Sequence, residues 1–332
     1  MPLGFLPEIS AAYLGPSRQR RIVGGMKLDT HVHTHHSGMT HIWPLSYIVR
    51  ESYNTPERVY RLAKQRGMDL VAITDHDTVD GAMRLAHFPD VIVGCEVSAH
   101  FPGHDVDVHL GVLDITREQF AEIDRRRDNV AALLPYLREQ DIFTTINHVA
   151  SQVNGRLTAA LIASLLPWVD AFEVRNGSRL RTQNRTAEAL AAATGKFQLG
   201  GSDSHTGRGI GRTYTVVDDV RTRAEFMAGL RAGRGRVEGR HGWYMTMTSD
   251  LMRFAGRFYE EKGAGTAEHP LDWRRHAALI ASAAMLPAVP LIFVGAAVHF
   301  IREARFNRSL LFDLVARPAA VHAAAASLVE AA

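Results

Sequence analysis

The chain has 332 residues, of which 46% are hydrophobic and 22% are charged, and its formal net charge is +3. With one cysteine, this composition excludes a disulfide scaffold, a collagen-like chain and a disordered chain, and it predicts a globular protein with a full-sized core. The charge is too small to indicate nucleic-acid binding by itself, and no basic tract interleaved with aromatic residues adds to it.

Residues 1–25 lack the basic start and the long apolar stretch of a signal peptide, and we interpret them as an N-terminal arm or as an upstream start before Met26. A lone cysteine, Cys95, can form no intramolecular disulfide, so we expect a reducing compartment, the cytoplasm. We expect Cys95 to be a small apolar residue of the core.

Short apolar runs alternate with longer helical patterns from residue 27 to residue 217, which is typical of a parallel α/β sheet or barrel. Seven strands are predicted at residues 27–30, 69–74, 91–96, 107–113, 142–147, 169–174 and 196–200, with a last strand at 212–217. Helices are predicted at residues 55–66, 116–139, 157–166 and 181–193, with Thr55 and Thr116 as N-caps of the first two.

Residues 277–300 contain no Asp, Glu, Lys or Arg, and arginines flank them on both sides. As a helix this run would be about 36 Å long, which is enough for a bilayer core. Pro287, Pro290 and the high alanine content favour a buried helical hairpin or an oligomerisation element instead, so both interpretations stay open. We therefore divide the chain into an arm (1–25), an α/β domain (26–240) and a helical C-terminal extension (241–332) with a potential membrane contact at 277–300.

Polar side chains that can bind metals recur at the ends of the predicted strands, where the sites of (β/α) barrels lie. In chain order they are His31 and His33, Asp75 and His76, Glu96, His109, His148, the segment 173–176, and Asp203 with His205. Structural histidines scattered at random would not follow the strand ends in this way.

Two of these pairs have the spacing of metal ligands. His31 and His33 are two residues apart on an extended segment, so their side chains point the same way and can bind one ion, and Asp203 and His205 repeat that spacing. Glu96 ends an otherwise apolar strand, where a carboxylate needs a metal or a strong donor. Its two oxygens could bridge two ions about 3.5 to 4 Å apart, as in two-metal hydrolases.

The strings DTHVH, AITDHDTVDGA, GCEVS, VHLGV, INHVA and GGSDSHT resemble, in this order, the motifs of the polymerase and histidinol phosphatase (PHP) superfamily of metal-dependent phosphoesterases. The resemblance covers residues 26–217. It implies a distorted seven-stranded (β/α) barrel that holds two or three divalent ions, Zn, Mn or Fe.

The resemblance also implies a ligand set. The first ion would be held by His31, His33, Glu96 and Asp203, the second by Glu96, His109 and His148, and the third by His76 and His205. Members of the superfamily usually carry a further Asp or His after the HxH pair, whereas Ser37 and Gly38 are followed here by Met39. Either His36 or His41 substitutes for that ligand, or the third site is weak or empty.

The implied reaction is hydrolysis of a small phosphomonoester or a short nucleotide by water shared between two ions that Glu96 bridges. His205 or His76 would protonate the leaving alkoxide if the third ion is absent. We expect Asp29 and Asp75 to orient ligand imidazoles, and Asp75 is close enough in sequence to be a ligand or catalytic acid itself.

Contacts to the phosphate are expected from polar residues after the sixth and seventh strands: Arg175, Asn176, Arg179, Arg208 and Arg212.

Two alternatives stay open at this point. Amidohydrolase barrels also begin with HxH, but they normally add a metal-bridging lysine at a strand end, and none of the four lysines of this chain lies there. In the other alternative the barrel is a regulatory module without catalysis, attached to the cytoplasmic face of the inner membrane by residues 277–300. The departure at Met39 favours that alternative, and the eight other ligand-type residues argue against it.

Overall fold

The computed structural model describes residues 25–40, 49–154, 156–268, 270–283 and 289–316. Most of the predicted N-terminal arm, His41 and part of the apolar run at 277–300 lie outside the described residues.

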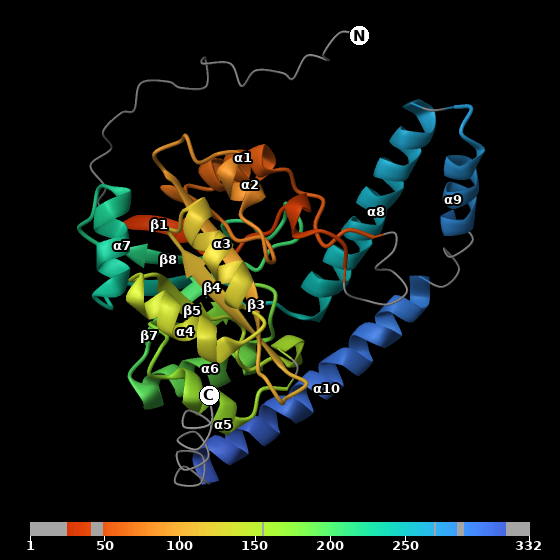
Figure 1. Ribbon diagram of the computed structural model, residues 1–332. Coiled ribbons are helices and arrows are strands. Elements are labelled where there is room, and N and C mark those ends of the chain that lie inside the picture. The colour runs from red at the N-terminus through yellow and green to blue at the C-terminus, as the bar shows by residue number, and fades with distance from the viewer. Residues whose placement is uncertain (1–24, 41–48, 155, 269, 284–288, 317–332) are drawn as a thin grey trace.

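A single mixed sheet forms the centre of the molecule (Figure 1). In the described residues it has nine strands, in the order β7-β6-β5-β4-β3-β2-β1-β8-β9. They are β1 (Met26–Asp29), β2 (Leu70–Ile73), β3 (Val91–His100), β4 (Asp107–Leu113), β5 (Phe143–Ile146), β6 (Ala171–Asn176), β7 (Phe197–Gly201), β8 (Thr213–Val217) and β9 (Arg236–Gly239). The prediction of a seven-stranded barrel with one further strand was therefore wrong in its count. It missed β9, whose partly exposed sequence RVEG carries no apolar run.

The sheet is nearly closed into a barrel. Just beyond β1 and β7, Val32 forms a parallel bridge with Ser204. There the His33 amide donates to the Ser204 carbonyl at 3.1 Å, and the Asp203 amide donates to the His31 carbonyl at 2.8 Å. The contact between the two strand ends brings the ligand-type residues of the first and last motifs together.

Strand β4 runs antiparallel to both of its neighbours, which corrects the prediction of a wholly parallel sheet. Its connection to β3 spans only residues 101–106, and a parallel pair needs a crossover of about a dozen residues or more. Because β4 runs the other way, its early residue His109 lies at the edge where the neighbouring strands end. His109 is paired in register with Ser98, near the end of β3.

Helices pack around this sheet. They are α1 (Pro56–Gln65), α2 (Asp80–Met83), α3 (Arg117–Arg126), α4 (Val130–Glu139), α5 (Ala159–Leu165), α6 (Arg181–Thr194) and α7 (Arg223–Arg231). Thr55 and Thr116 cap α1 and α3 as predicted, accepting hydrogen bonds from Arg58 N and Gln119 N. The single helix predicted at 116–139 is two helices, because Asn129 takes an extended conformation and its side chain caps α4.

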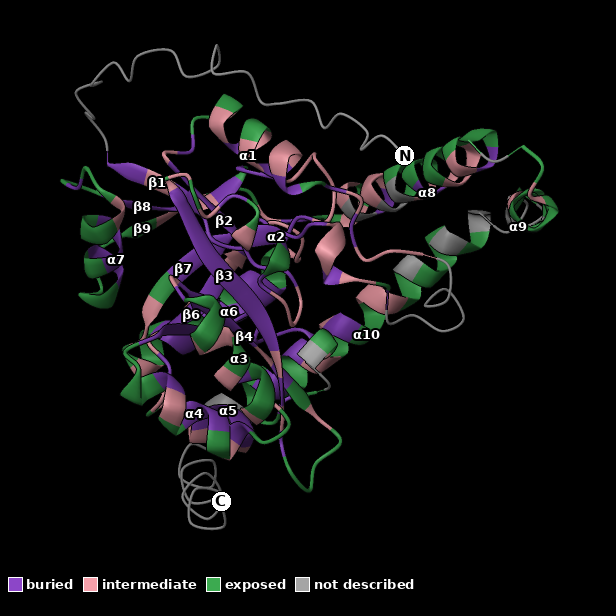
Figure 2. Ribbon diagram, turned by 45° about the horizontal axis from the view of Figure 1, so that its top comes forward, coloured by how far each residue is buried: buried purple, intermediate pink, exposed green. Residues whose placement is uncertain are grey.

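The buried core consists of the sheet and the helix faces that contact it, and Figure 2 shows the strands buried and the outer helix faces exposed. Every residue of β2 is buried, as are the first seven of β3. Cys95 is fully buried in the core cluster, which confirms the prediction made for it.

Three helices form the C-terminal region: α8 (Tyr244–Glu268), α9 (Trp273–Ala283) and α10 (Val289–Ala316). Helix α10 lies against α5 and α6 (Figure 1) through a buried polar contact. The Glu303 carboxylate, 1% exposed, accepts hydrogen bonds from Gln152 N and from Gln183 Nε2. Leu310 adds an apolar contact to the core cluster.

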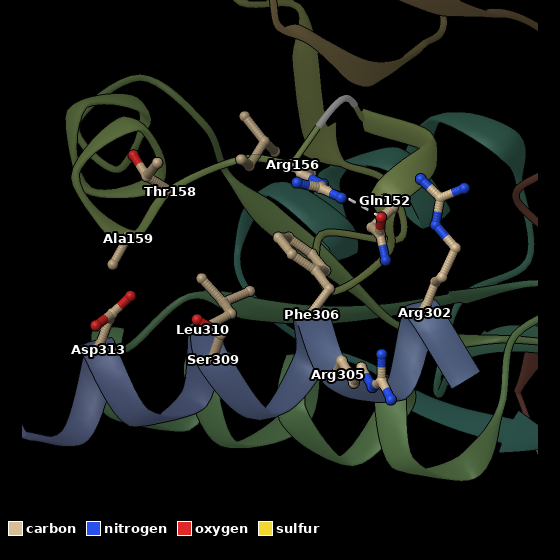
Figure 3. A pocket seen from close by; sticks show the side chains of 11 residues that line it. Gln152, Arg156, Thr158, Ala159, Arg302, Arg305, Phe306, Ser309, Leu310 and Asp313 are labelled. Carbon is tan, nitrogen blue, oxygen red and sulfur yellow. Dashed lines mark hydrogen bonds between the residues drawn. The ribbon is translucent and has the colours of Figure 1, made fainter. Parts of the chain in front are cut away.

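A hollow of about 670 Å³ lies between α10 and the segment before α5. Figure 3 shows the side chains that line it. Arg302 and Phe306 of α10 face Gln152 and Arg156 across it.

None of the described helices is long and apolar enough to cross a membrane. The described part of the run at 277–300 forms the end of α9 and the start of α10.

Candidate metal centre

Four buried side chains from three separate motifs meet just beyond the ends of β1 and β7. His31 Nε2 lies 2.9 Å from His33 Nε2 and 3.0 Å from Glu96 Oε2. His33 Nε2 lies 3.3 Å from the same Glu96 oxygen. Asp203 Oδ1 lies 3.7 Å from His31 Nε2 and 3.6 Å from His33 Nε2.

These separations fit one small cation. Ligands at about 2.0 to 2.1 Å from a tetrahedral metal lie roughly 3.3 Å from one another. The five distances above scatter around that value, from 2.9 to 3.7 Å. Two ring nitrogens facing each other at 2.9 Å can share only one proton, whereas a cation accepts a lone pair from each. The side chains His31, His33, Glu96 and Asp203 therefore fit a divalent metal.

The other oxygen of Glu96 faces a second group. Glu96 Oε1 lies 2.9 Å from His148 Nε2 and 3.4 Å from His109 Nδ1, and it accepts a hydrogen bond from Asn147 Nδ2 at 2.9 Å. Gly111 stands opposite Glu96 on β4, and a Cβ there would approach Asn147 Oδ1 to 2.8 Å. Glu96 is thus placed between two groups of ligand-type nitrogens.

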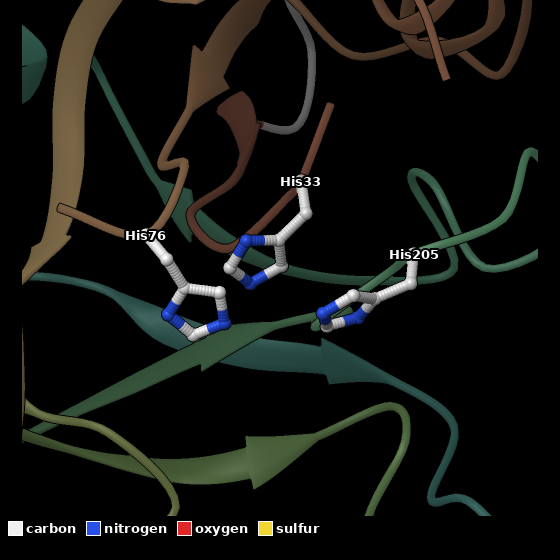
Figure 4. Close-up of side chains that lie close together, drawn as sticks. All are labelled: His33, His76 and His205. Carbon is white, nitrogen blue, oxygen red and sulfur yellow. The ribbon is translucent and has the colours of Figure 1, made fainter. Parts of the chain in front are cut away.

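A third group consists of three imidazoles, His33, His76 and His205, shown in Figure 4. One ring nitrogen from each lies within 4.8 Å of the others, and the ring of His33 stacks on those of His76 and His205 at 4.5 and 4.2 Å. His76 Nδ1 also lies 3.4 Å from Glu96 Oε2, so His76 adjoins the other groups. Glu51, which the sequence analysis did not single out, lies 3.5 Å from His205 Nε2.

Glu173 orients His31. Its Oε1 lies 2.9 Å from His31 Nδ1, and its Oε2 accepts hydrogen bonds from His148 N and from Asn176 Nδ2. An Nδ1 proton held by Glu173 leaves the Nε2 lone pair of His31 directed at the cluster. In a regular strand Glu173 and Asn176, three residues apart, would face opposite sides, but a register shift in β6 between Glu173 and Arg175 turns both inward.

The charges around His31, His33, Glu96 and Asp203 favour the binding of a cation. Burial lowers the pKa of His33, but hydrogen bonds with Asp203 and Glu96 outweigh it and raise that pKa to about 9. Burial opposes the ionisation of Glu96 and Asp203 as well, yet the charge of His31 holds the pKa of both carboxyls well below the ordinary range. The site therefore keeps ionised carboxylates in a dry environment, where a metal cation would balance their charge in place of protonated imidazoles.

Asp29 and Asp75 are the acids predicted to orient imidazoles. Asp75 does so only indirectly, and the prediction for Asp29 was wrong, whereas Glu173, which was not predicted for this role, contacts His31. Asp29 accepts hydrogen bonds from the backbone amides of Ser202, Gly211 and His31. Its carboxylate therefore holds the backbone segments after β7 and after β1 in place. Burial raises its pKa to about 6.

The carboxylate of Asp75 is held by the Thr34 amide and hydroxyl and by Ser37 Oγ. Ser37 Oγ in turn lies 3.2 Å from His33 Nδ1, so Asp75 acts on an imidazole through Ser37. Asp75 is thus turned toward the loop after β1, which argues against its being a metal ligand or a catalytic acid.

The expected phosphate contacts divide into two sets. Asn176 Nδ2 and Arg179 Nη2 each lie 3.1 Å from Asp203 Oδ2, so both are at the metal centre. Arg175 faces the other side of β6 and pairs with Glu188 at 3.0 Å, which corrects its assignment. Arg208 lies farther out, where it donates to Ser249 Oγ of α8 and lines a hollow together with Arg212.

The candidates for the missing ligand of the third group are not supported in the part of the chain that the structure describes. The ring of His36 is tilted against that of His35, with the ring centroids 4.4 Å apart, and His36 belongs to none of the described groups that could hold an ion. Met39 is 38% exposed and its backbone bridges that of Arg50. His41 lies outside the described residues.

The segment that carries the last motif matches a known family. Residues 181–234, which run from α6 past Asp203 and His205 to α7, match the family model described as PHP-associated. An uncharacterized protein of Methanocaldococcus jannaschii is 34% identical over 77 residues, which are 22% of this chain and 44% of that protein. The chain thus spans less than half the length of this curated relative.

A solved structure with a TM-score of 0.50 shares the fold, and a second has a lower TM-score. PsfC from Pseudomonas syringae superposes with a TM-score of 0.50 at 18% identity, covering 70% of this chain and 98% of that one. A two-domain protein from Bacteroides vulgatus that contains a predicted PHP-like metal-dependent phosphoesterase gives a TM-score of 0.47 at 15% identity, over 68% of this chain and 69% of that one.

Proposed function

We propose that this chain, as a member of the PHP superfamily, is a hydrolase that cleaves phosphate esters with the help of divalent metal ions. The observation that carries the proposal is the convergence on Glu96, from separate strand ends, of His31, His33, His76, His109 and His148.

The residues assigned to the ions follow the three groups. In this proposal His31, His33, Glu96 and Asp203 hold the first ion, Glu96, His109 and His148 hold the second, and His76 and His205, beside His33, are the candidates for a third. Divalent ions bound there would lower the pKa of water and neutralise charge on the phosphoryl oxygens. We propose Zn, Mn or Fe, because imidazole and carboxylate ligands suit these metals.

The substrate is a small phosphomonoester or a short nucleotide in this proposal. Arg179 binds its phosphoryl group, because this guanidinium lies at the metal centre with a side chain that is 19% exposed. Asn176 keeps Asp203 and Glu173 in place through its amide nitrogen.

If the third site holds no ion, His205 is the better of the two candidates for the proton donor. Burial holds the pKa of His76 well below its ordinary value, against the opposing effect of Glu96, so His76 is neutral and suits metal binding. His205 is more exposed, with 26% of its side chain accessible, and it faces a hollow. Its Nε2 is the atom that would deliver a proton to the leaving alkoxide.

An amidohydrolase of the lysine-bridged type is a poorer fit. Lys64 binds Asp90, and Lys196 donates to the Val169 carbonyl. Lys27 and Lys262 lie over the rings of Tyr214 and Phe258. All four lysines are therefore engaged away from Glu96.

The test is a phosphatase screen of metal-reconstituted protein with nucleotides, sugar phosphates and phosphopeptides, run beside Asp203→Ala. The wild type should release phosphate from at least one substrate, and the variant should be slower by about 100-fold or more, because the first ion loses a ligand and Arg179 loses its partner. Equal turnover by both proteins, or no turnover with any of the three metals, would contradict the proposal.

A further inference from the structure

A hollow of about 530 Å³ opens beside the metal centre, and His205 lies on its wall. The other walls come from α1, from the loop between β7 and β8, and from α8. These segments are far apart in the sequence and are joined by specific contacts. Thr206 Oγ1 donates to Asp250 of α8 at 3.0 Å, and Arg208 donates to Ser249.

Arginine dominates the lining of this hollow, which we call the arginine pocket. Its arginines are Arg58 from α1 and Arg66 directly after it, Arg208 and Arg212 from the loop, and Arg253 and Arg257 from α8.

Little negative charge on the protein balances these six side chains. Among the described lining residues Glu260 is the one acid, and it pairs with Arg257 at 2.6 Å. Arg66 donates to the carbonyl oxygen of Ile210, and Arg208 donates to the hydroxyl oxygen of Ser249, so both bind neutral acceptors. The other five arginines of the pocket form no ion pair with a carboxylate in the described part of the chain. The nearby Asp250 accepts a hydrogen bond from Thr206, and its carboxylate also interacts with the charges of Arg208, Arg212 and Arg253, so two carboxylates face six arginines.

The guanidinium groups are crowded enough to repel one another. Burial, and then the charges of Arg257 and Arg61, lower the pKa of Arg58. Burial and the charge of Arg212 lower the pKa of Arg66. An anion placed among these groups would relieve the repulsion, and the planar guanidinium matches phosphate oxygens in pairs.

We propose that the arginine pocket binds a second phosphate-bearing group of the substrate, a diphosphate, while the ester to be cleaved lies at the metal centre. This inference rests on the proposed function, since it places the two groups on either side of His205. One phosphoryl group carries about −1.5 to −2 charges, so a single phosphate would leave most of the charge of the six arginines uncompensated. A diphosphate suits both this charge and the volume of the pocket.

The experiment is a calorimetric titration of inorganic pyrophosphate into the Mn²⁺-loaded full chain, with Mn²⁺ in fixed excess so that chelation by the probe stays constant. The double variant Arg212→Ala/Arg253→Ala removes two exposed arginines that come from two different segments, the loop before β8 and α8. Lys262→Ala removes one positive charge from the same helix, α8, at a position outside the pocket.

The double variant should bind pyrophosphate at least about tenfold more weakly than the wild type, since each charge-assisted hydrogen bond is worth a factor of this order. Lys262→Ala should bind within about twofold of the wild type. Asp203→Ala should keep pyrophosphate binding, because the pocket does not depend on the first ion. Arg212→Lys/Arg253→Lys should recover part of the affinity, and unchanged melting temperatures would show that the variants fold.

Unchanged affinity in the double variant, or a loss that Lys262→Ala shares, would overturn the inference. Loss of binding in Asp203→Ala but not in the double variant would assign pyrophosphate to the metals and would also overturn it. Failure of the proposed function is seen separately, in the phosphatase screen. Without turnover of any ester there, pyrophosphate binding by the pocket can still be measured.

Discussion

At the scale of single residues, Glu96 organises the site. It lies in the middle of β3, among the first seven residues of that strand, which are all buried, and its two oxygens face different sets of imidazoles. The sequence could predict this role because a carboxylate in a dry strand needs a compensating partner. Spacing was equally informative for His31 and His33, since period-two alternation makes them point the same way.

Other residue assignments failed where side-chain direction departs from simple alternation. The register shift in β6 turns Glu173 and Asn176 toward the metal centre and Arg175 toward Glu188. No residue of that strand indicates such a shift in the sequence. Asp29 and Asp75 lie beside the histidine motifs in sequence, yet both serve mainly to hold loops. Proximity in the chain therefore did not predict which acid orients His31.

Glu173→Gln should weaken metal binding by about 10- to 100-fold without unfolding the protein. The amide can donate to His31 Nδ1 and so favour the tautomer that carries its proton on Nε2, where the ion should bind. Competition with a chromogenic chelator measures the affinity. Glu188→Gln, which removes a carboxylate paired with Arg175 outside the site, is the control and should bind metal like the wild type. Equal affinity of Glu173→Gln and the wild type would refute the role given to Glu173.

At the scale of elements, positions of helices and strands were predicted better than their pairing. Capping residues marked the starts of α1 and α3, and apolar runs marked β1 to β8. The turn at Asn129 inside a continuous helical pattern was missed, because its apolar period continues into α4. The reversal of β4 was also missed, although the short connection 101–106 was visible in the sequence.

Helix α10 illustrates an element whose role depends on tertiary contacts. The sequence offered a membrane span or a buried hairpin for the run at its start, while the later polar residues Glu303 and Asn307 received no role. Both are buried, and they bind Gln183 and Thr186 of α6. Periodicity cannot distinguish such a polar contact from a solvated helix face.

Glu303→Ala should lower the free energy of unfolding by about 2 to 4 kcal/mol, because Gln152 N and Gln183 Nε2 lose their acceptor inside the protein. Urea denaturation measures the loss. Arg308→Ala changes an exposed residue of the same helix and should stay within about 0.5 kcal/mol of the wild type. A Glu303→Ala protein as stable as Arg308→Ala would show that this contact does not hold α10 in place.

At the scale of the whole molecule, closure of the sheet brings together residues that the chain separates by more than 170 positions. The backbone bridge between Val32 and Ser204 sets Asp203 beside His31 and His33. Order along the chain sufficed to predict that these motifs share one centre, since the sites of such barrels lie at one end of the strands. The arginine pocket could not be predicted in this way, because α8 contributes to it from outside the barrel motifs.

The central claim is that this closed arrangement is a centre for more than one metal ion. Equilibrium dialysis of the full chain against Zn²⁺, Mn²⁺ and Fe²⁺ at neutral pH, followed by elemental analysis, tests it most directly. We expect at least two ions per chain for the preferred metal, because Glu96 presents one oxygen to each of two groups of nitrogens. Fewer than two tightly bound ions per chain with every metal would contradict the account.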